Sequence, residues 1–166
     1  EPVPVGDGVP PVYRWLAEQG AEEGGDARPA RPSPILELPM AFTPGGPQLD
    51  YQYLSTYHWH TTPDGYSGFI PPNHGQIVYE MERFPSERAV SLLQALGVRH
   101  LVIHTERYPA SRRQEMADAL PGMADLVPVE SFGPDRVYEV APRAFDAGGL
   151  EVDVYFPPSA AAGQPY

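Results

Sequence analysis

The chain has 166 residues, a length that suits one globular domain, and a formal net charge of −11 from 22 acidic and 11 basic residues. Every basic residue is arginine and no Arg-rich cluster occurs, which excludes a phosphate-binding surface and therefore nucleic acid as a partner. Cysteine is absent, so disulfides and thiolate metal sites are excluded, and no run of about 18 apolar residues predicts a membrane span.

The N-terminal part is expected to contain a linker, a helix and a loop. Residues 1–9 have the composition of a linker, and the missing initiator Met and leader features suggest a piece of a longer protein. Pro11 suits a first helical position, and apolar residues follow at one-face spacing, so a short amphipathic helix is predicted to end at Gly20. Residues 21–34 are polar and rich in glycine and proline, which is typical of a mobile loop.

The next segment combines a short strand with an aromatic stretch. Residues 35–38 are largely apolar and stop at a proline, which predicts a buried strand. Residues 50–57 place leucine and tyrosine side chains on one face of a helix that Asp50 could cap, although a strand is the alternative. From residue 61 to 72, repeated proline and glycine steps predict irregular backbone.

Two helices and a second strand are predicted next. Capping-box spacing at Asn73 precedes the apolar stripe of the first helix. The second helix is predicted over residues 85–96, where Gly97 ends it, and residues 98–104 follow as a largely apolar strand. Because helix, glycine and strand form half of an α/β crossover, this strand and residues 35–38 are expected to be parallel neighbours.

The C-terminal part predicts a helix, a hairpin and a last strand. Residues 109–120 suit a helix, and apolar segments at 126–132 and 136–140 flank a Gly-Pro-Asp turn, which is typical of an antiparallel hairpin. Residues 150–156 alternate apolar and polar side chains and predict a half-buried strand, with residues 157–166 as a tail.

These elements predict one α/β domain over residues 10–156. Its sheet is expected to be small and mainly parallel, with flanking helices and an antiparallel hairpin at one edge. The sequence contains no G-x-G-x-x-G or Walker A motif and no complete catalytic constellation, and it gives no reason to expect a cofactor.

The histidines near the aromatic stretch allow two interpretations. His58 and His60 form an H-x-H pair, which on extended backbone puts both rings on one side, as metal sites exploit. A third ligand could be Asp64, His74 or His104, and spacing does not choose among them. The alternative, which the aromatic surroundings favour, is that both rings form hydrogen bonds within the loop.

His104 is a separate candidate because it stands where the predicted parallel strand ends. Ligands in open α/β sheets gather beyond the carboxyl ends of strands, so His104 is a candidate to line a site, and a structural role is the alternative. His100, within the strand, is expected to be structural. Carboxylates near the aromatic stretch, Glu37 among them, have no partner that spacing identifies.

The aromatic side chains also suggest a carbohydrate contact. Tyr57, Trp59 and Tyr66 are candidate platforms, since a pyranose packs against an apolar ring face with a polar tip, and core packing is the alternative. Ser67 lacks the strand-to-helix context of a nucleophile elbow, because Pro63 precedes it and further prolines follow. The glycines around it are expected to permit a tight turn.

Five short segments succeed one another between residues 10 and 140: VYRWLA at 12–17, ILELP at 35–39, STYHWH at 55–60, DGYSGF at 64–69 and LGVRHLVIH at 96–104. In this order they resemble the soluble C-terminal domain of bacterial polytopic membrane proteins related to GT-C glycosyltransferases. The resemblance implies a multi-pass membrane half that carries out transfer from lipid-linked sugar donors, and a soluble domain outside the cytoplasmic membrane. It assigns no catalytic residue to this chain, and residues 150–166 have no counterpart in it.

The resemblance implies a soluble accessory domain without catalysis of its own, at the extracytoplasmic face of a bacterial membrane. Its partners would be the membrane half of its parent chain and a glycan or lipid-linked sugar. The alternatives are a stand-alone metal-dependent hydrolase that uses His58 and His60, and a purely structural interaction domain. The candidate ligand-binding residues are Tyr57, His58, Trp59, His60, Asp64, Tyr66, Ser67 and His104.

Overall fold

The fold is given by a computed structural model that describes residues 4–23, 33–41, 46–64 and 72–143. This part of the chain contains both helices and strands, together with short 3-10 turns. In chain order the elements are η1 (Gly6–Gly8), α1 (Pro11–Glu23), β1 (Ile35–Leu38), α2 (Gln48–His58), α3 (His74–Met81), α4 (Glu87–Ala95), β2 (His100–His104), η2 (Thr105–Arg107), α5 (Ala110–Ala119), η3 (Leu120–Gly122), β3 (Leu126–Phe132) and β4 (Asp135–Val140).

The four described strands form one mixed sheet in the order β1-β2-β4-β3. β1 and β2 are parallel, with Ile35 opposite His100, whereas β4 is antiparallel to both β2 and β3. The α/β class, the parallel pair and the hairpin at one edge are confirmed, but the expectation of a mainly parallel sheet is wrong. Among the described strands, one crossover connection joins a parallel pair, β1 and β2. The second strand of the hairpin, β4, pairs with β2 in the antiparallel direction, so most of the strand pairs are antiparallel.

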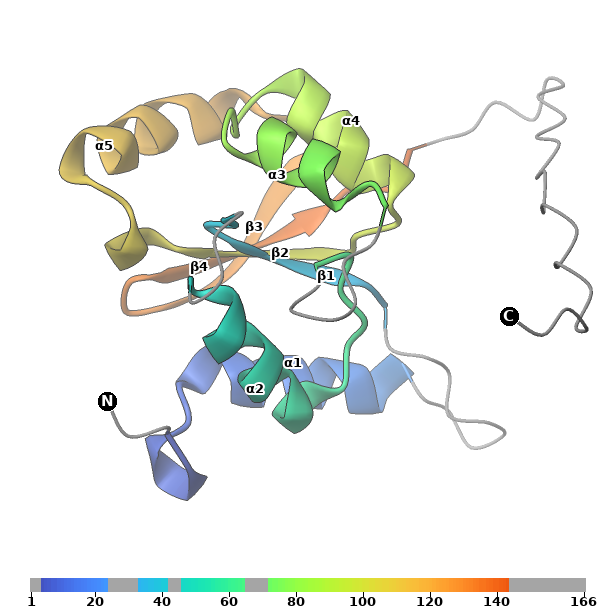
Figure 1. The fold of residues 1–166 in the computed structure, drawn as a ribbon, viewed down its shortest axis with the longest axis vertical. Helices are drawn as coiled ribbons and strands as arrows, with labels where there is room; N and C mark the ends of the chain where they lie inside the picture. The colour runs from blue at the N-terminus through green and yellow to red at the C-terminus, as the bar shows by residue number, and fades with distance from the viewer. Residues whose placement is uncertain (1–3, 24–32, 42–45, 65–71, 144–166) are drawn as a thin grey trace, which may run out of the picture.

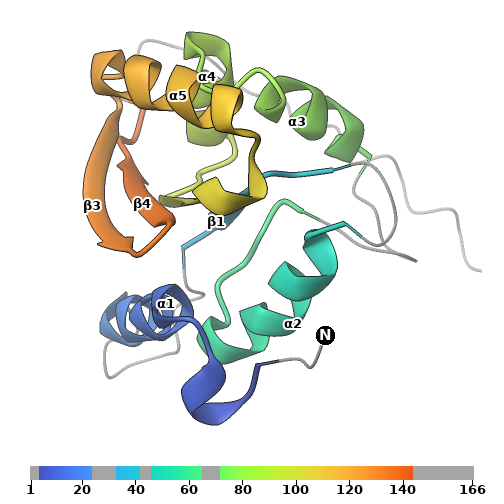
Figure 2. The same ribbon diagram turned by 90° about the vertical axis from the view of Figure 1, so that its left-hand side faces the viewer.

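Helices cover both faces of this sheet. Figure 1 and Figure 2 show α1 and α2 on one face, and α3, α4 and α5 on the other. Leu36 and Leu101 belong to the apolar core under α3, α4 and α5, while Ile35 and Val102 belong to the core under α1 and α2. Successive side chains of a strand point to opposite faces, so the short strands β1 and β2 contribute to both cores and are buried along their whole length.

The helices lie close to where the sequence predicts them, but α1 continues to Glu23, past its predicted end at Gly20, and two predicted N-caps are wrong. Asp50 lies in the first turn of α2 and does not cap it. Asn73 occupies the N-cap position of α3 without a side-chain capping bond, because its backbone (φ −93°, ψ 2°) is not the extended conformation that a cap requires. In α4 the Ser86 hydroxyl does accept a hydrogen bond from the Ala89 backbone N–H, and Gly97 follows the helix at a φ of 68°.

Some predicted segments lie largely or wholly outside the described residues. The loop predicted for residues 21–34 is described only at its ends, and the strand predicted for residues 150–156 and the tail at 157–166 lie outside altogether. Within the expected N-terminal linker, Gly6–Gly8 form a 3-10 turn and Val9 packs into the core under α1. Packing therefore begins just before residue 10.

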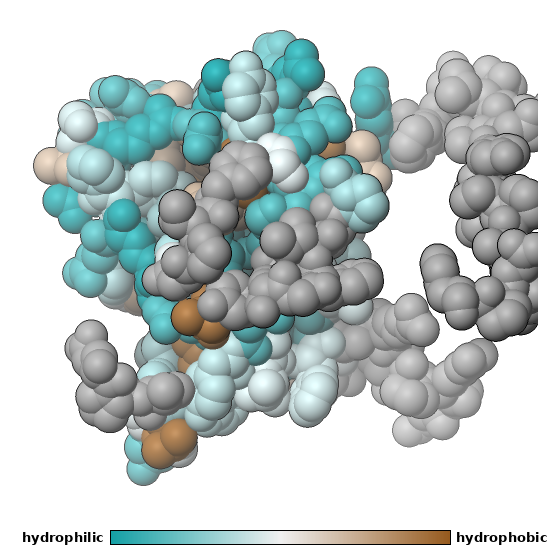
Figure 3. Space-filling view, in the orientation of Figure 1, coloured by the Kyte–Doolittle hydropathy of each residue, from teal (hydrophilic) through white to brown (hydrophobic). Residues whose placement is uncertain are grey.

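The surface is mainly hydrophilic where it can be followed. Figure 3 shows one face on which hydrophilic side chains predominate and hydrophobic ones form only small patches. The large hydrophobic side chains exposed among the described residues include Trp59, Tyr79, Val127 and Val129. In the part of the chain that the structure describes, none of the helices has the length and apolar content needed to cross a bilayer.

Candidate functional site

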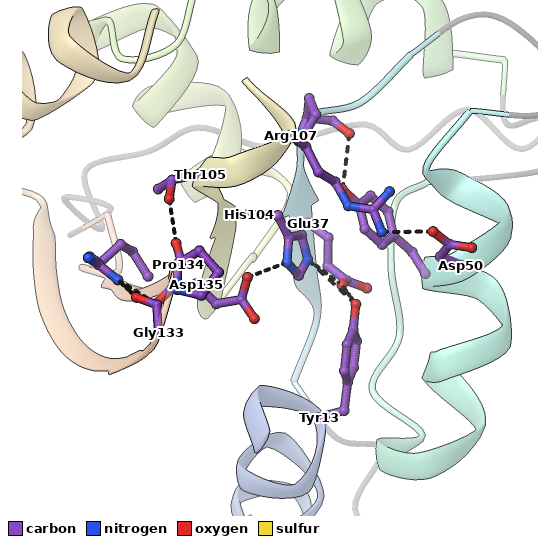
Figure 4. Close-up of polar contacts among 12 residues, drawn as sticks. Tyr13, Glu37, Asp50, His104, Thr105, Arg107, Gly133, Pro134 and Asp135 are labelled. Carbon is purple, nitrogen blue, oxygen red and sulfur yellow. Dashed lines mark hydrogen bonds and ion pairs between the residues drawn. The ribbon is translucent and has the colours of Figure 1, made fainter. Parts of the chain in front are cut away.

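A polar cluster is buried between the sheet and helices α1 and α2 (Figure 4). His104, the last residue of β2, lies between two carboxylates. Its Nε2 is 3.0 Å from Glu37 Oε2 on β1, and its Nδ1 is 2.8 Å from Asp135 Oδ1 at the start of β4. Tyr13 of α1 donates its hydroxyl to the same Glu37 oxygen at 2.7 Å. The cluster therefore connects one helix with three neighbouring strands.

The two carboxylates determine the charge of His104. Burial alone opposes a charged imidazole, but hydrogen bonds to Asp135 and Glu37, together with their negative charges, outweigh it and raise the His104 pKa to about 9. Burial and then the charge of Glu37 raise the pKa of Tyr13, so its hydroxyl stays protonated and keeps donating. At neutral pH the cluster is a charge-assisted network around an imidazolium.

Side chains from α2 and the turn after β2 cover this network. Tyr51 stacks on His104 with ring centroids 5.0 Å apart and planes inclined by 20°. Arg107 lies over the Tyr51 ring, 5.3 Å from its centroid, and binds Asp50 at 2.7 Å. With both nitrogens occupied and the ring covered, His104 is a buried positive link between strands rather than an open base or a metal ligand.

The H-x-H motif forms a sharp turn at the end of α2. Trp59 has a left-handed backbone conformation (φ 56°, ψ 12°), and its side chain is 74% exposed. His58 and His60 on either side of it are buried, with ring centroids 5.4 Å apart. The two rings thus lie together, but through a left-handed turn and not through the extended backbone that the metal interpretation required.

Hydrogen bonds to the backbone occupy most of the ring nitrogens in this turn. His58 Nδ1 accepts from the His60 backbone N–H at 3.1 Å. His60 Nδ1 lies 2.8 Å from the Ser33 carbonyl oxygen, and its Nε2 lies 2.9 Å from that of Leu16. The structure therefore agrees with hydrogen bonding within the fold, and in the described ranges no three His, Cys, Asp or Glu side chains are grouped to hold a metal ion.

The other candidates lie apart from one another. Asp64 pairs with His74 at 2.7 Å, and both side chains are buried. Tyr57 is half-buried and packs against the core under α1. Tyr66 and Ser67 lie outside the described residues. The candidates on described residues thus fall into the His104 cluster, the turn at Trp59, and the Asp64 pair.

Sequence reasoning missed three members of the buried cluster. Tyr13 was expected only as part of an amphipathic helix, Asp135 only as a turn residue, and Glu37 as a carboxylate without a partner. One local signal was present, because a glutamate inside the apolar segment ILEL at 35–38 must be buried and buried carboxylates need partners. No comparable signal marked Tyr13 or Asp135.

The candidate residues in the described part of the chain thus form the covered His104 network, the exposed turn at Trp59 and the buried Asp64–His74 pair. Comparison of the chain with protein-family models, with curated proteins and with solved structures gave no match.

Proposed function

We propose that the chain is an accessory domain of a membrane glycosyltransferase-like protein, at the extracytoplasmic face of a bacterial membrane. In this role it binds a glycan or the sugar of a lipid-linked donor, or it packs on the membrane half of its parent chain. The chemistry belongs to that membrane half. The contact surface is centred on Trp59 at the end of α2.

The exposure of Trp59 carries the proposal. A tryptophan that is 74% exposed gains little of the stabilisation that burial of an indole provides. Its left-handed backbone also disfavours most residues other than glycine, asparagine and aspartate. The turn is needed to orient His58 and His60, but nothing in its geometry requires an indole, so a contact outside the fold accounts for this side chain.

Two tyrosines of α2 add further aromatic surface. Tyr53 and Tyr57 are one helical turn apart, with ring centroids 6.1 Å apart and planes at 72°. Tyr53 is 36% exposed. Ring faces with polar tips suit the alternating apolar and hydroxyl surfaces of a pyranose.

The His104 network supports the non-catalytic part of the proposal. Its imidazole is held at both nitrogens by Glu37 and Asp135, so it has no free lone pair with which to accept a substrate proton. The cluster instead fixes α1 against the sheet.

Tryptophan fluorescence provides the test. The chain has two tryptophans, and Trp15 packs against His100 and Phe132, so a Trp15→Phe variant leaves Trp59 as the single reporter. Titration of that variant with a panel of methyl pyranosides and oligosaccharides is expected to give a saturable, blue-shifted signal as a sugar covers the indole.

Two single substitutions make the test specific. Trp59→Ala should abolish saccharide binding measured by calorimetry without changing the melting temperature, because the indole is exposed. Tyr79→Ala removes a ring that is 50% exposed on α3, across the sheet, and should leave binding unchanged. Undiminished saccharide binding by Trp59→Ala would contradict the proposal. If the unsubstituted chain binds no saccharide, the proposed role is restricted to packing on the membrane half of the longer protein.

A further inference from the structure

A small cavity, lined by several polar residues, lies between β1, α2 and the segment that follows α2. The backbone N–H of Ile35 donates to the carbonyl of Thr61, which holds that segment beside β1. The cavity has a volume of about 10 Å³, room for about one water-sized group. Its lining includes the buried side chains of Glu37, Tyr51, His58 and Asp64, together with the half-buried Gln52.

The protonation of His58 follows from its surroundings. Its Nδ1 accepts a hydrogen bond from the His60 backbone N–H, so that nitrogen carries no proton. Burial, with a contribution from the nearby His60, lowers the pKa of His58 to about 4, and the ring is therefore neutral at physiological pH. A neutral imidazole with a bare Nδ1 has its proton on Nε2.

This Nε2–H group lacks an acceptor within the described residues. His58 is only 4% exposed, and Nε2 is a buried atom without a hydrogen-bond partner there. Burying a donor without an acceptor is unfavourable, so a group that can accept is expected beside it. His58 is also one of the side chains that line the cavity.

Glu37 supplies the complementary acceptor. Within the described residues, both hydrogen bonds to Glu37, from Tyr13 and from His104, end on Oε2, which leaves Oε1 for a further donor. A group that bridges His58 and Glu37 must therefore accept one hydrogen bond and donate another. An ammonium ion can only donate and a carboxylate can only accept, whereas a hydroxyl does both.

We propose that this cavity is a binding site for a single hydroxyl group, which accepts from His58 Nε2–H and donates to Glu37 Oε1. The hydroxyl is that of water or of a small polyol, of which only this one hydroxyl enters the cavity. The site is distinct from the Trp59 surface, since Trp59 does not line the cavity.

Nuclear magnetic resonance of the histidine rings tests the site in the intact chain. A long-range ¹H–¹⁵N spectrum is expected to show His58 as the Nε2–H tautomer. Titration with glycerol and with a methyl pyranoside should shift this Nε2–H signal saturably if the hydroxyl is that of a polyol. A nuclear Overhauser contact with a long-lived water, without a polyol shift, identifies water as the occupant.

Two substitutions of His58 test the roles of its two ring nitrogens separately. His58→Asn keeps an acceptor for the His60 N–H but removes the distal donor, and it should weaken polyol binding at least about tenfold or remove the retained water. His58→Gln keeps a distal donor and should retain part of the effect. Trp59→Ala should leave the His58 signal and its response unchanged, which separates this site from the proposed glycan surface.

Two results would overturn the proposal. One is an Nδ1–H tautomer of His58. The other is an Nε2–H signal that responds neither to polyol nor to water. Because both are measured on the unsubstituted chain, they hold even if a His58 variant does not fold.

Discussion

The buried imidazolium of His104 should make the stability of the fold depend on pH above neutrality. The folded-state pKa of His104 is about 9, raised from about 6.5 for an unperturbed histidine. Between these two values the folded chain binds one proton more than the unfolded chain, so the free energy of unfolding decreases as pH rises. The contribution of His104 is complete below about pH 6.5 and is lost once the pH passes about 9.

The size of the effect follows from the same interval. The interval between the unfolded and the folded pKa of His104 spans roughly 2.5 pH units, and each unit corresponds to about 1.4 kcal/mol. The free energy of unfolding should therefore decrease by ~3 kcal/mol. The groups that face His104 are Glu37, Asp135, Tyr13 and Tyr51. Burial raises the pKa of both tyrosines, so neither loses its proton in this window. A loss of this size is a large part of the 5–15 kcal/mol that is typical of a domain.

Urea denaturation between about pH 6.5 and about pH 9.5 measures this loss. A His104→Gln variant is the matched control, because its amide can still donate to Glu37 but does not titrate, and its free energy of unfolding should be flat over the same range. A ring titration of His104 by nuclear magnetic resonance gives the folded pKa independently. The reasoning is refuted if the unsubstituted chain shows no decrease over this range, or if His104→Gln shows the same decrease.

Substitutions of three glycines give further predictions, each measurable by urea denaturation. Gly97→Ala should destabilise the fold by about 1 kcal/mol, because φ is 68° there although no atom would contact the new methyl group. Gly122→Ala is its control, with equally open space and no positive φ, and should be neutral or slightly stabilising. Gly20→Ala should destabilise by about 1 kcal/mol despite better helix propensity, since its Cβ would lie 3.3 Å from Nε2 of His60, a ring held at both nitrogens. A stabilised Gly20→Ala variant would mean that the His60 ring can move aside.

The sequence located most of the candidate residues but not their partners. His104 was a candidate because it was predicted to end a strand, and it does end β2, yet its partners Glu37 and Asp135 lie 67 and 31 positions away in the sequence. The H-x-H pair was visible as a motif, but the left-handed turn at Trp59 that buries both rings was not. A tryptophan is an unfavourable residue for that conformation, so local preference pointed away from it.

The sequence by itself indicated the α/β class, the approximate positions of most described helices and strands, the parallel pairing of β1 with β2 and the β3–β4 hairpin. These features depend on contacts between residues a few positions apart, such as the Ser86 cap and the alternation of side chains along a strand, or on a single crossover connection. Only the tertiary structure decided that β4 lies between β2 and β3, and that His104 carries a charge between Glu37 and Asp135. Both depend on the burial and the charges of residues that are far apart in the sequence. These contributions to the free energy arise only when the helices pack on the sheet and bring those residues together.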